Sequence, residues 1–199
     1  MTLDDLSNAC EHGRQDDVER ALDAGIDING RDSEGWTPLR AAAAFDRLQI
    51  VNLLLARGAD VNRKNKDGTT PLFGAARSGN FDIALLLIDN GADVNARDLD
   101  GRVPLNEALT NRKSASHTEV IKLLLSNGAQ VSVKGAFGRT PLHQAAQNNN
   151  VAGARLLLQY DADVNARDDD GNTPLQLHED EERGDEGEQM QDLLRSAGG

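Results

Sequence analysis

The stretch Asp67-Gly68-Thr69-Thr70-Pro71-Leu72-Phe73-Gly74-Ala75-Ala76 decides the fold, because its Thr-Pro-Leu core returns along the chain at a nearly fixed interval. The five copies, the third of which reads Val-Pro-Leu, have their prolines at Pro38, Pro71, Pro104, Pro141 and Pro174. Successive prolines are 71 − 38 = 33, 104 − 71 = 33, 141 − 104 = 37 and 174 − 141 = 33 residues apart. Such a period predicts a stack of small units in which each packs on the next.

Each unit carries the signals of two short helices. Thr followed by Pro starts the first helix, because the hydroxyl caps a free backbone amide and Pro needs no donor at the first helical position. A run such as Leu53-Leu54-Leu55 marks the apolar stripe of the second helix, which one unit alone cannot bury. Gly follows the second helix at 25, 58, 91 and 128, where a left-handed backbone ends the helix. The fifth unit has Asp161 there, which predicts a strained joint.

The recurring pattern Asp-x-x-Gly-x-Thr-Pro-Leu, Ala-Ala, Leu-Leu and Gly-Ala-Asp-Val-Asn resembles the ankyrin repeat. The resemblance implies an all-α solenoid of stacked helix-turn-helix units with projecting β-hairpin loops, forming a single domain over 1–199. Arg20 and Arg195 replace apolar residues of the leucine run in the two terminal units, as solvent-facing caps require. We therefore expect an N-terminal cap at 1–31, internal repeats at 32–64, 65–97, 98–134 and 135–167, and a C-terminal cap at 168–199.

Two segments interrupt the regular pattern. The four extra residues of the long interval are predicted to form a surface loop within Thr110–His117, because the landmarks on either side keep their spacing. The acidic stretch from Glu179 to Glu188 has seven carboxylates and one arginine, Arg183. We expect a solvated loop of the C-terminal cap there, with an acidic recognition tract as the alternative.

Bulk properties narrow the class of protein. A formal net charge of −12 argues against a whole-molecule attraction to nucleic acid or anionic lipid. The single cysteine, Cys10, cannot form an internal disulfide, so we expect a reducing compartment and a cytoplasmic location. The chain shows no basic segment followed by an apolar run at its start and no apolar stretch near 18 residues, so a leader or a membrane span is not expected.

The sequence offers no assembled catalytic or metal chemistry. Gly-Lys-Ser/Thr, Gly-x-Gly-x-x-Gly and Gly-x-Ser-x-Gly motifs are absent. The acidic turns 98–101 and 168–171 superficially suggest calcium loops, but Ala96 and Ala166 occupy the first ligand positions. Cys10 stands at a packing position, and the family resemblance implies a structural hydrogen-bonding role for His143. We therefore expect a protein that is not an enzyme and that uses no cofactor or metal.

One basic residue per unit forms what we call the basic row: Arg31, Lys64, Arg97, Lys134 and Arg167. Two interpretations stay open. The row is either a functional stripe that attracts acidic groups, or a structural and solubilising feature of the repeat.

The family resemblance implies binding through a concave surface of hairpin tips and exposed first-helix residues. The variable positions there are Trp36, Phe45, Lys66, Thr69, Arg77, Leu99, Arg102, Phe137, Arg139 and Gln147. Aromatic residues with arginine are typical of protein interfaces. We therefore expect a monomeric protein-binding module, an adaptor, inhibitor or immunity-type protein, whose partner presents an acidic and apolar segment. Binding of nucleic acid or another polyanion along the basic row is the alternative.

Overall fold

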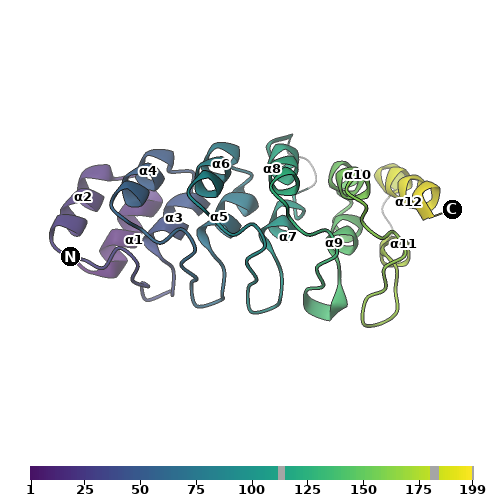
Figure 1. Cartoon of the computed structure of the whole chain (residues 1–199), viewed down its shortest axis with the longest axis horizontal. Coiled ribbons are helices and arrows are strands. Elements are labelled where there is room, and N and C mark those ends of the chain that lie inside the picture. The colour runs from purple at the N-terminus through teal and green to yellow at the C-terminus, as the bar shows by residue number, and fades with distance from the viewer. Residues whose placement is uncertain (112–114, 180–183, 199) are drawn as a thin grey trace.

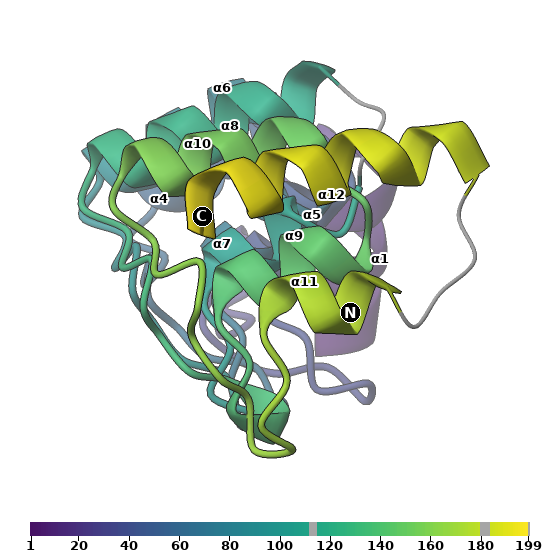
Figure 2. The ribbon, with the colours of Figure 1, turned by 90° about the vertical axis from the view of Figure 1, so that its right-hand side faces the viewer.

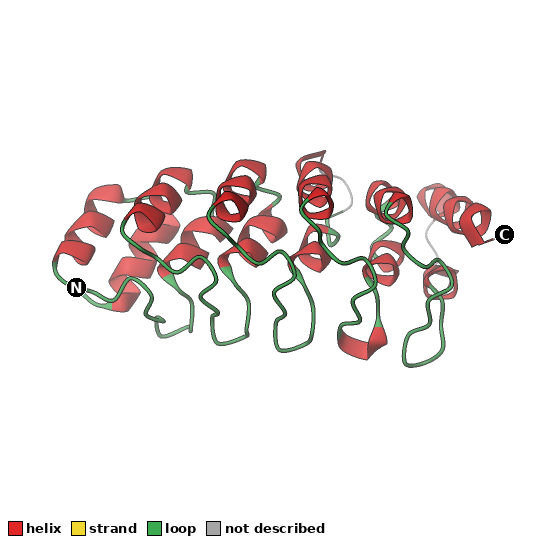
Figure 3. Ribbon diagram, viewed as in Figure 1, coloured by secondary structure: helices red, strands yellow, loops and turns green. Residues whose placement is uncertain are grey.

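The computed structural model describes residues 1–111, 115–179 and 184–198. Within these ranges the secondary structure is helical, with connecting loops and no strand (Figure 3). The all-α prediction is confirmed, whereas the β-hairpins expected between units are tight loops without strands. Each loop is closed by two backbone hydrogen bonds, such as those from Asp32 N to Trp36 O and from Gly35 N to Asp32 O, both at 2.9 Å. One loop contains a short 3₁₀ turn, η1 (Ala136–Gly138).

The helices form two parallel rows that run the length of an elongated stack (Figures 1 and 2). The first helix of each pair is α1 (Leu3–His12), α3 (Pro38–Ala44), α5 (Pro71–Ser78), α7 (Pro104–Ala108), α9 (Pro141–Gln147) or α11 (Pro174–Glu179). The second is α2 (Gln15–Asp23), α4 (Leu48–Ala56), α6 (Phe81–Asp89), α8 (Ala115–Ser126), α10 (Val151–Gln159) or α12 (Gly184–Gly198). The loops between pairs all project on the side of the first helices (Figure 2).

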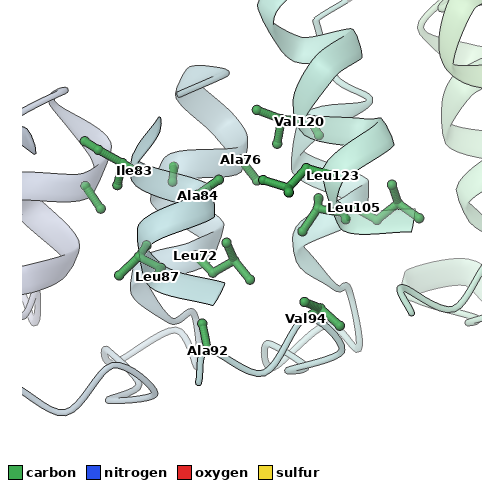
Figure 4. Close-up of a cluster of buried hydrophobic side chains, with 14 of the residues drawn as sticks. Leu72, Ala76, Ile83, Ala84, Leu87, Ala92, Val94, Leu105, Val120 and Leu123 are labelled. Atoms are coloured by element: carbon green, nitrogen blue, oxygen red, sulfur yellow. The ribbon is translucent and has the colours of Figure 1, made fainter. Parts of the chain in front are cut away.

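Small residues let the first helices approach one another. Ala75 and Ala76 of α5 are fully buried, and α5 packs between α3 and α7. Leucine and isoleucine side chains of the second helices, such as the fully buried Leu87 and Ile83, fill the space behind them, and Leu87 lies beside Leu72 (Figure 4). Full burial of one such side chain stabilises by roughly 1.5–3 kcal/mol, so the stacked rows share one continuous apolar core.

Left-handed residues follow the second helices at the positions that the sequence predicted. Gly25, Gly58, Gly91 and Gly128 have positive φ after the second helices, and Asp161 takes the same conformation with φ 61°. Asp46 and Asn149 do so after α3 and α9, with φ 59° and 53°. These non-glycine residues accept a conformation that costs them about 1 kcal/mol relative to glycine.

The C-terminal part of the segment predicted to hold the insert is helical. Residues 112–114 lie outside the described part, but Ala115–His117 extend the start of α8 by one turn, and α7 stops early at Ala108. His117 is buried, and its Nε2 lies 3.0 Å from the carbonyl oxygen of Arg77. The four extra residues were predicted to form a surface loop within Thr110–His117, between the two helices of the unit. The structure ends α7 at Ala108 and begins α8 at Ala115, so Ala115–His117 are helical rather than part of a loop, and the buried His117 contacts the preceding repeat.

The C-terminal cap docks through Met190 and Leu194 of α12, which are almost fully buried. Arg195 is exposed, as is Arg20 at the other end of the stack. Residues 180–183 of the acidic stretch lie outside the described part. Residues 184–188 belong to the first turns of α12, so a loop over the whole stretch is wrong.

Candidate functional site

We call the surface formed by the inter-repeat loops and the first helices the loop face. A groove of about 550 Å³ lies on it, between the second and third internal repeats and extending back to Arg40 of the first. Its walls are Arg40, Asp67, Thr69, Phe73, Arg77, Leu99, Asp100, Arg102, Glu107 and Thr110. Four predicted site residues, Thr69, Arg77, Leu99 and Arg102, are thus brought together in one depression.

Arg40 is the functional candidate that the sequence pattern did not reveal. It is 7% exposed, its Nε donates to Thr69 Oγ1 at 2.8 Å, and its guanidinium carbon lies 3.9 Å from the centre of the Trp36 ring. Its Nη1 is buried without an acceptor among the described residues. Burial, followed by repulsion from Arg77, lowers the pKa of Arg40. The signal in the sequence was a charged residue at the position that His143 occupies in its own repeat.

Arg102 is held within its own repeat rather than projecting freely. Its Nε donates to Asp98 Oδ2 at 2.9 Å, and its other nitrogens lie 3.3 Å from Asp100 and 3.6 Å from Glu107. The Asp98 side chain is 1% exposed. Because three carboxylates surround this guanidinium, Arg102 shapes the groove wall and stabilises the loop.

Phe137, Arg139 and Gln147 form a second group, in the fourth internal repeat. Arg139 Nη1 donates to Gln147 Oε1 at 3.3 Å, its Nε lies 3.6 Å from Asp168 Oδ2, and its guanidinium carbon is 5.5 Å from the Phe137 ring centre. Phe137 itself is 69% exposed. This group presents a large apolar ring beside an anchored cation.

The third group lies at the N-terminal end, where Trp36 and Phe45 pack with ring centres 6.1 Å apart. Trp36 is partly buried and Phe45 is 40% exposed.

Thr69, in contrast, is buried beneath Arg40, so its hydroxyl supports the groove from within. Lys66 and Arg77 are exposed. The backbone N–H of Lys66 donates a hydrogen bond to the carbonyl oxygen of Gly35 in the preceding loop.

The two residues assigned to structural roles are both buried. Burial raises the pKa of the Cys10 thiol to about 12, which leaves it a packing residue. His143 is 0% exposed, and its Nδ1 accepts from Thr140 N at 3.2 Å. Its Nε2 therefore carries the proton and donates to Asn172 O at 3.0 Å. Burial lowers the pKa of His143, which favours this neutral form. The histidine links consecutive repeats.

The basic row makes a chain of side-chain to backbone hydrogen bonds. Arg31 donates to the carbonyl of Lys64, Lys64 to Arg97, Arg97 to Lys134 and Lys134 to Arg167, at distances between 2.8 and 3.4 Å. Asparagines make a parallel chain: Asn62 accepts from Asp93 N at 2.8 Å and donates to Gly91 O at 2.9 Å. Both sets join neighbouring repeats, which gives the basic row a structural role.

A comparison with known families agrees with this architecture. The family model for ankyrin repeats, in three copies, matches residues 6–98, 50–135 and 105–178. The chain belongs to the ankyrin repeat family. Members of the family are generally protein-protein interaction modules and are typically not catalytic. None of the helices in the described ranges has the length and apolar character needed to cross a membrane.

Proposed function

We propose that this protein is a non-catalytic binding module, acting as an adaptor, inhibitor or immunity-type protein, that holds a partner protein against its loop face. Three groups of predicted site residues occupy that face, and two of their side chains, Leu99 and Phe137, are 78% and 69% exposed. Large apolar side chains in such positions lose water contact only when a partner covers them, which favours association.

The backbone of Phe137 is the observation that carries the proposal. Phe137 has φ 60°, a left-handed conformation that a bulky residue adopts at a cost. The Phe137 carbonyl is held by Asp169 N at 3.0 Å, so the turn fixes the ring outward. Strain combined with an exposed aromatic ring is typical of a functional site rather than of a stabilising contact.

The chemistry of the groove supports a partner segment that is both acidic and apolar. Leu99 offers the apolar contact, while the exposed Arg77 offers a cation close to Arg40. The basic row, in contrast, is engaged with carbonyl oxygens along the stack. These bonds account for the row without a polyanion, so a protein partner is favoured over nucleic acid.

The proposed cellular location and oligomeric state of the protein rest on its cysteine and its core. The buried, unpaired thiol of Cys10 suits a reducing compartment, and we propose a cytoplasmic location. The continuous core needs no second copy to cover it, which supports a monomer before partner binding.

Paired double variants test the proposal. Partners captured by the tagged protein should be lost with Leu99→Ser/Phe137→Ser and retained with Leu85→Ser/Tyr160→Ser. The control pair removes comparably large apolar side chains, 37% and 43% exposed, from the second-helix side. Mass spectrometry of both captures gives the readout. An unchanged partner set with the loop-face variant, or loss with the control alone, would refute the assignment.

A further inference from the structure

A second depression, which we call the acidic pocket, lies at the N-terminal end of the loop face. It has a volume of about 380 Å³, and its walls include Asp4, Glu11, Asp32, Glu34, Trp36 and Phe45. Four carboxylates thus surround two aromatic rings, and its walls contain no lysine or arginine. The pocket lies between α1 and the first inter-repeat loop, apart from the groove described above.

Two of the four carboxylates, Asp4 and Asp32, accept hydrogen bonds from backbone N–H groups that hold them in place. Asp4 Oδ1 accepts from Ser33 N at 2.7 Å, and this bond lowers the pKa of Asp4. Asp32 Oδ1 accepts from Trp36 N at 2.8 Å and from Glu34 N at 3.0 Å. Within the described ranges none of the four forms an ion pair with a basic side chain. The pocket therefore gathers four acidic side chains with no lysine or arginine in its wall.

A buried hydroxyl in the wall lacks a hydrogen-bond partner among the described residues. Ser7 is 6% exposed, lines the pocket, and its Oγ has no hydrogen-bond partner among the described residues. Buried polar groups are normally hydrogen-bonded, and a hydroxyl oxygen can accept a hydrogen bond from an N–H group as well as donate one. An ammonium or guanidinium group supplies only donors.

The aromatic walls select an organic cation over a metal ion. The Trp36 ring already stacks with Arg40 at 3.9 Å on one face, which shows that it accepts a guanidinium. Among the described residues no group of three or more carboxylates, histidines or cysteines converges as metal ligands do. A side chain with an apolar stem and a cationic end matches both the rings and the carboxylates.

We propose that the acidic pocket receives an arginine or lysine side chain of the partner protein. The inference rests on the proposed function, because the side chain belongs to a protein held on the loop face. It adds a second, opposite requirement to the partner, which then carries a basic residue for the acidic pocket in addition to the acidic and apolar residues for the groove. Opposite charges at two places along the stack would fix the direction in which the partner lies.

Capped tripeptides test the pocket without the partner. Acetylated and amidated Ala-Arg-Ala and Ala-Lys-Ala should shift the fluorescence of Trp36, the single tryptophan, and its indole N–H resonance, with saturation in the millimolar range. Ala-citrulline-Ala, which keeps the shape of arginine but lacks its charge, should bind about fivefold more weakly, and added salt should weaken the charged peptides. The ratio of the dissociation constants of the arginine and lysine peptides shows whether the pocket prefers a guanidinium or an ammonium group.

Matched charge variants locate the effect. Glu11→Gln/Glu34→Gln should weaken the charged peptides about fivefold, whereas Asp82→Asn/Asp89→Asn, which removes two exposed carboxylates from α6, should leave them unchanged. Equal binding of the citrulline peptide, or equal weakening by both variants, would overturn the proposal. The peptide experiment uses no partner protein, so its outcome is independent of the capture experiment with the Leu99 and Phe137 variants. Failure of this inference can therefore be told apart from failure of the proposed function.

Discussion

The guanidinium of Arg31 donates two hydrogen bonds, from Nε and Nη2, to the backbone carbonyl oxygen of Lys64, one repeat further along the chain (3.1 and 2.9 Å). Lys64 makes the equivalent bond to Arg97 at 2.9 Å. The basic row is thus a set of links between repeats, and its members hold the loops in register. A stack in which each repeat contacts only its neighbours depends on such links for its cooperativity.

The first prediction removes one of these links. Lys64→Met should lower the free energy of unfolding by about 1 kcal/mol, because the Arg97 carbonyl loses its donor. Lys66→Met is the matched control, since Lys66 is exposed and its side chain makes no hydrogen bond described in the structure. Urea denaturation of both variants gives the comparison. Equal stability of the two would show that the Lys64 bond contributes nothing.

A missing link in the asparagine chain can be restored. Ser132 stands where the other repeats have Asn62 and Asn95, each of which bonds the following repeat twice. By the same spacing, Ser132→Asn should donate to the carbonyl of Asp161 and accept from Asp163 N, and stabilise by about 0.5–1.5 kcal/mol. Thermal denaturation checks the gain. Ser132→Ala is the control, and a gain of the same size in both variants would contradict the hydrogen-bond explanation.

The left-handed joint after α10 is a site of strain. Asp161 has φ 61°, where the preceding repeats have glycine, so Asp161→Gly should stabilise by a few tenths to about 1 kcal/mol. The midpoint of urea unfolding is the measurement. Asp163→Gly, which has no positive φ to relieve, should bring no gain. A fall in the midpoint for Asp161→Gly would count against the strain.

Phe137 should show opposite effects on stability and on binding. Phe137→Gly relieves the left-handed strain and should stabilise the isolated protein by about 1 kcal/mol. The same change removes an exposed ring and should weaken partner binding by about 1–3 kcal/mol. Calorimetry of unfolding and of binding measures the two effects. Loss of stability together with intact binding would assign the ring a structural role instead.

Most of the fold was predictable because its signals are local and repeated. The Thr-Pro starts, the glycine ends and the leucine stripes each act within one repeat, and the period then fixes the stack. Even Asp161 could be assigned a left-handed backbone from its position alone. The insert could not be placed fully, because its His117 contacts Arg77 forty residues earlier.

The site was less predictable because side-chain partners come from different segments. Arg102 matched an interface position, but Asp98, Asp100 and Glu107 surround it from the loop and from α7. Arg40 could not be predicted as a site residue, because its burial depends on contacts with Trp36 and with Thr69 of the next repeat. The position of a residue within its repeat predicts which face of the molecule it lies on. Whether its side chain is available to a partner depends on contacts with other segments, which only the three-dimensional structure shows.

Amide hydrogen exchange of the protein with and without its captured partner tests the central claim most directly. We expect partner-induced protection in residues 32–45, 65–77, 98–108 and 135–147, which form the inter-repeat loops and the first helices. The second helices α4, α6, α8 and α10 should exchange at unchanged rates. Protection confined to those second helices, with the loops unaffected, would contradict binding through the loop face.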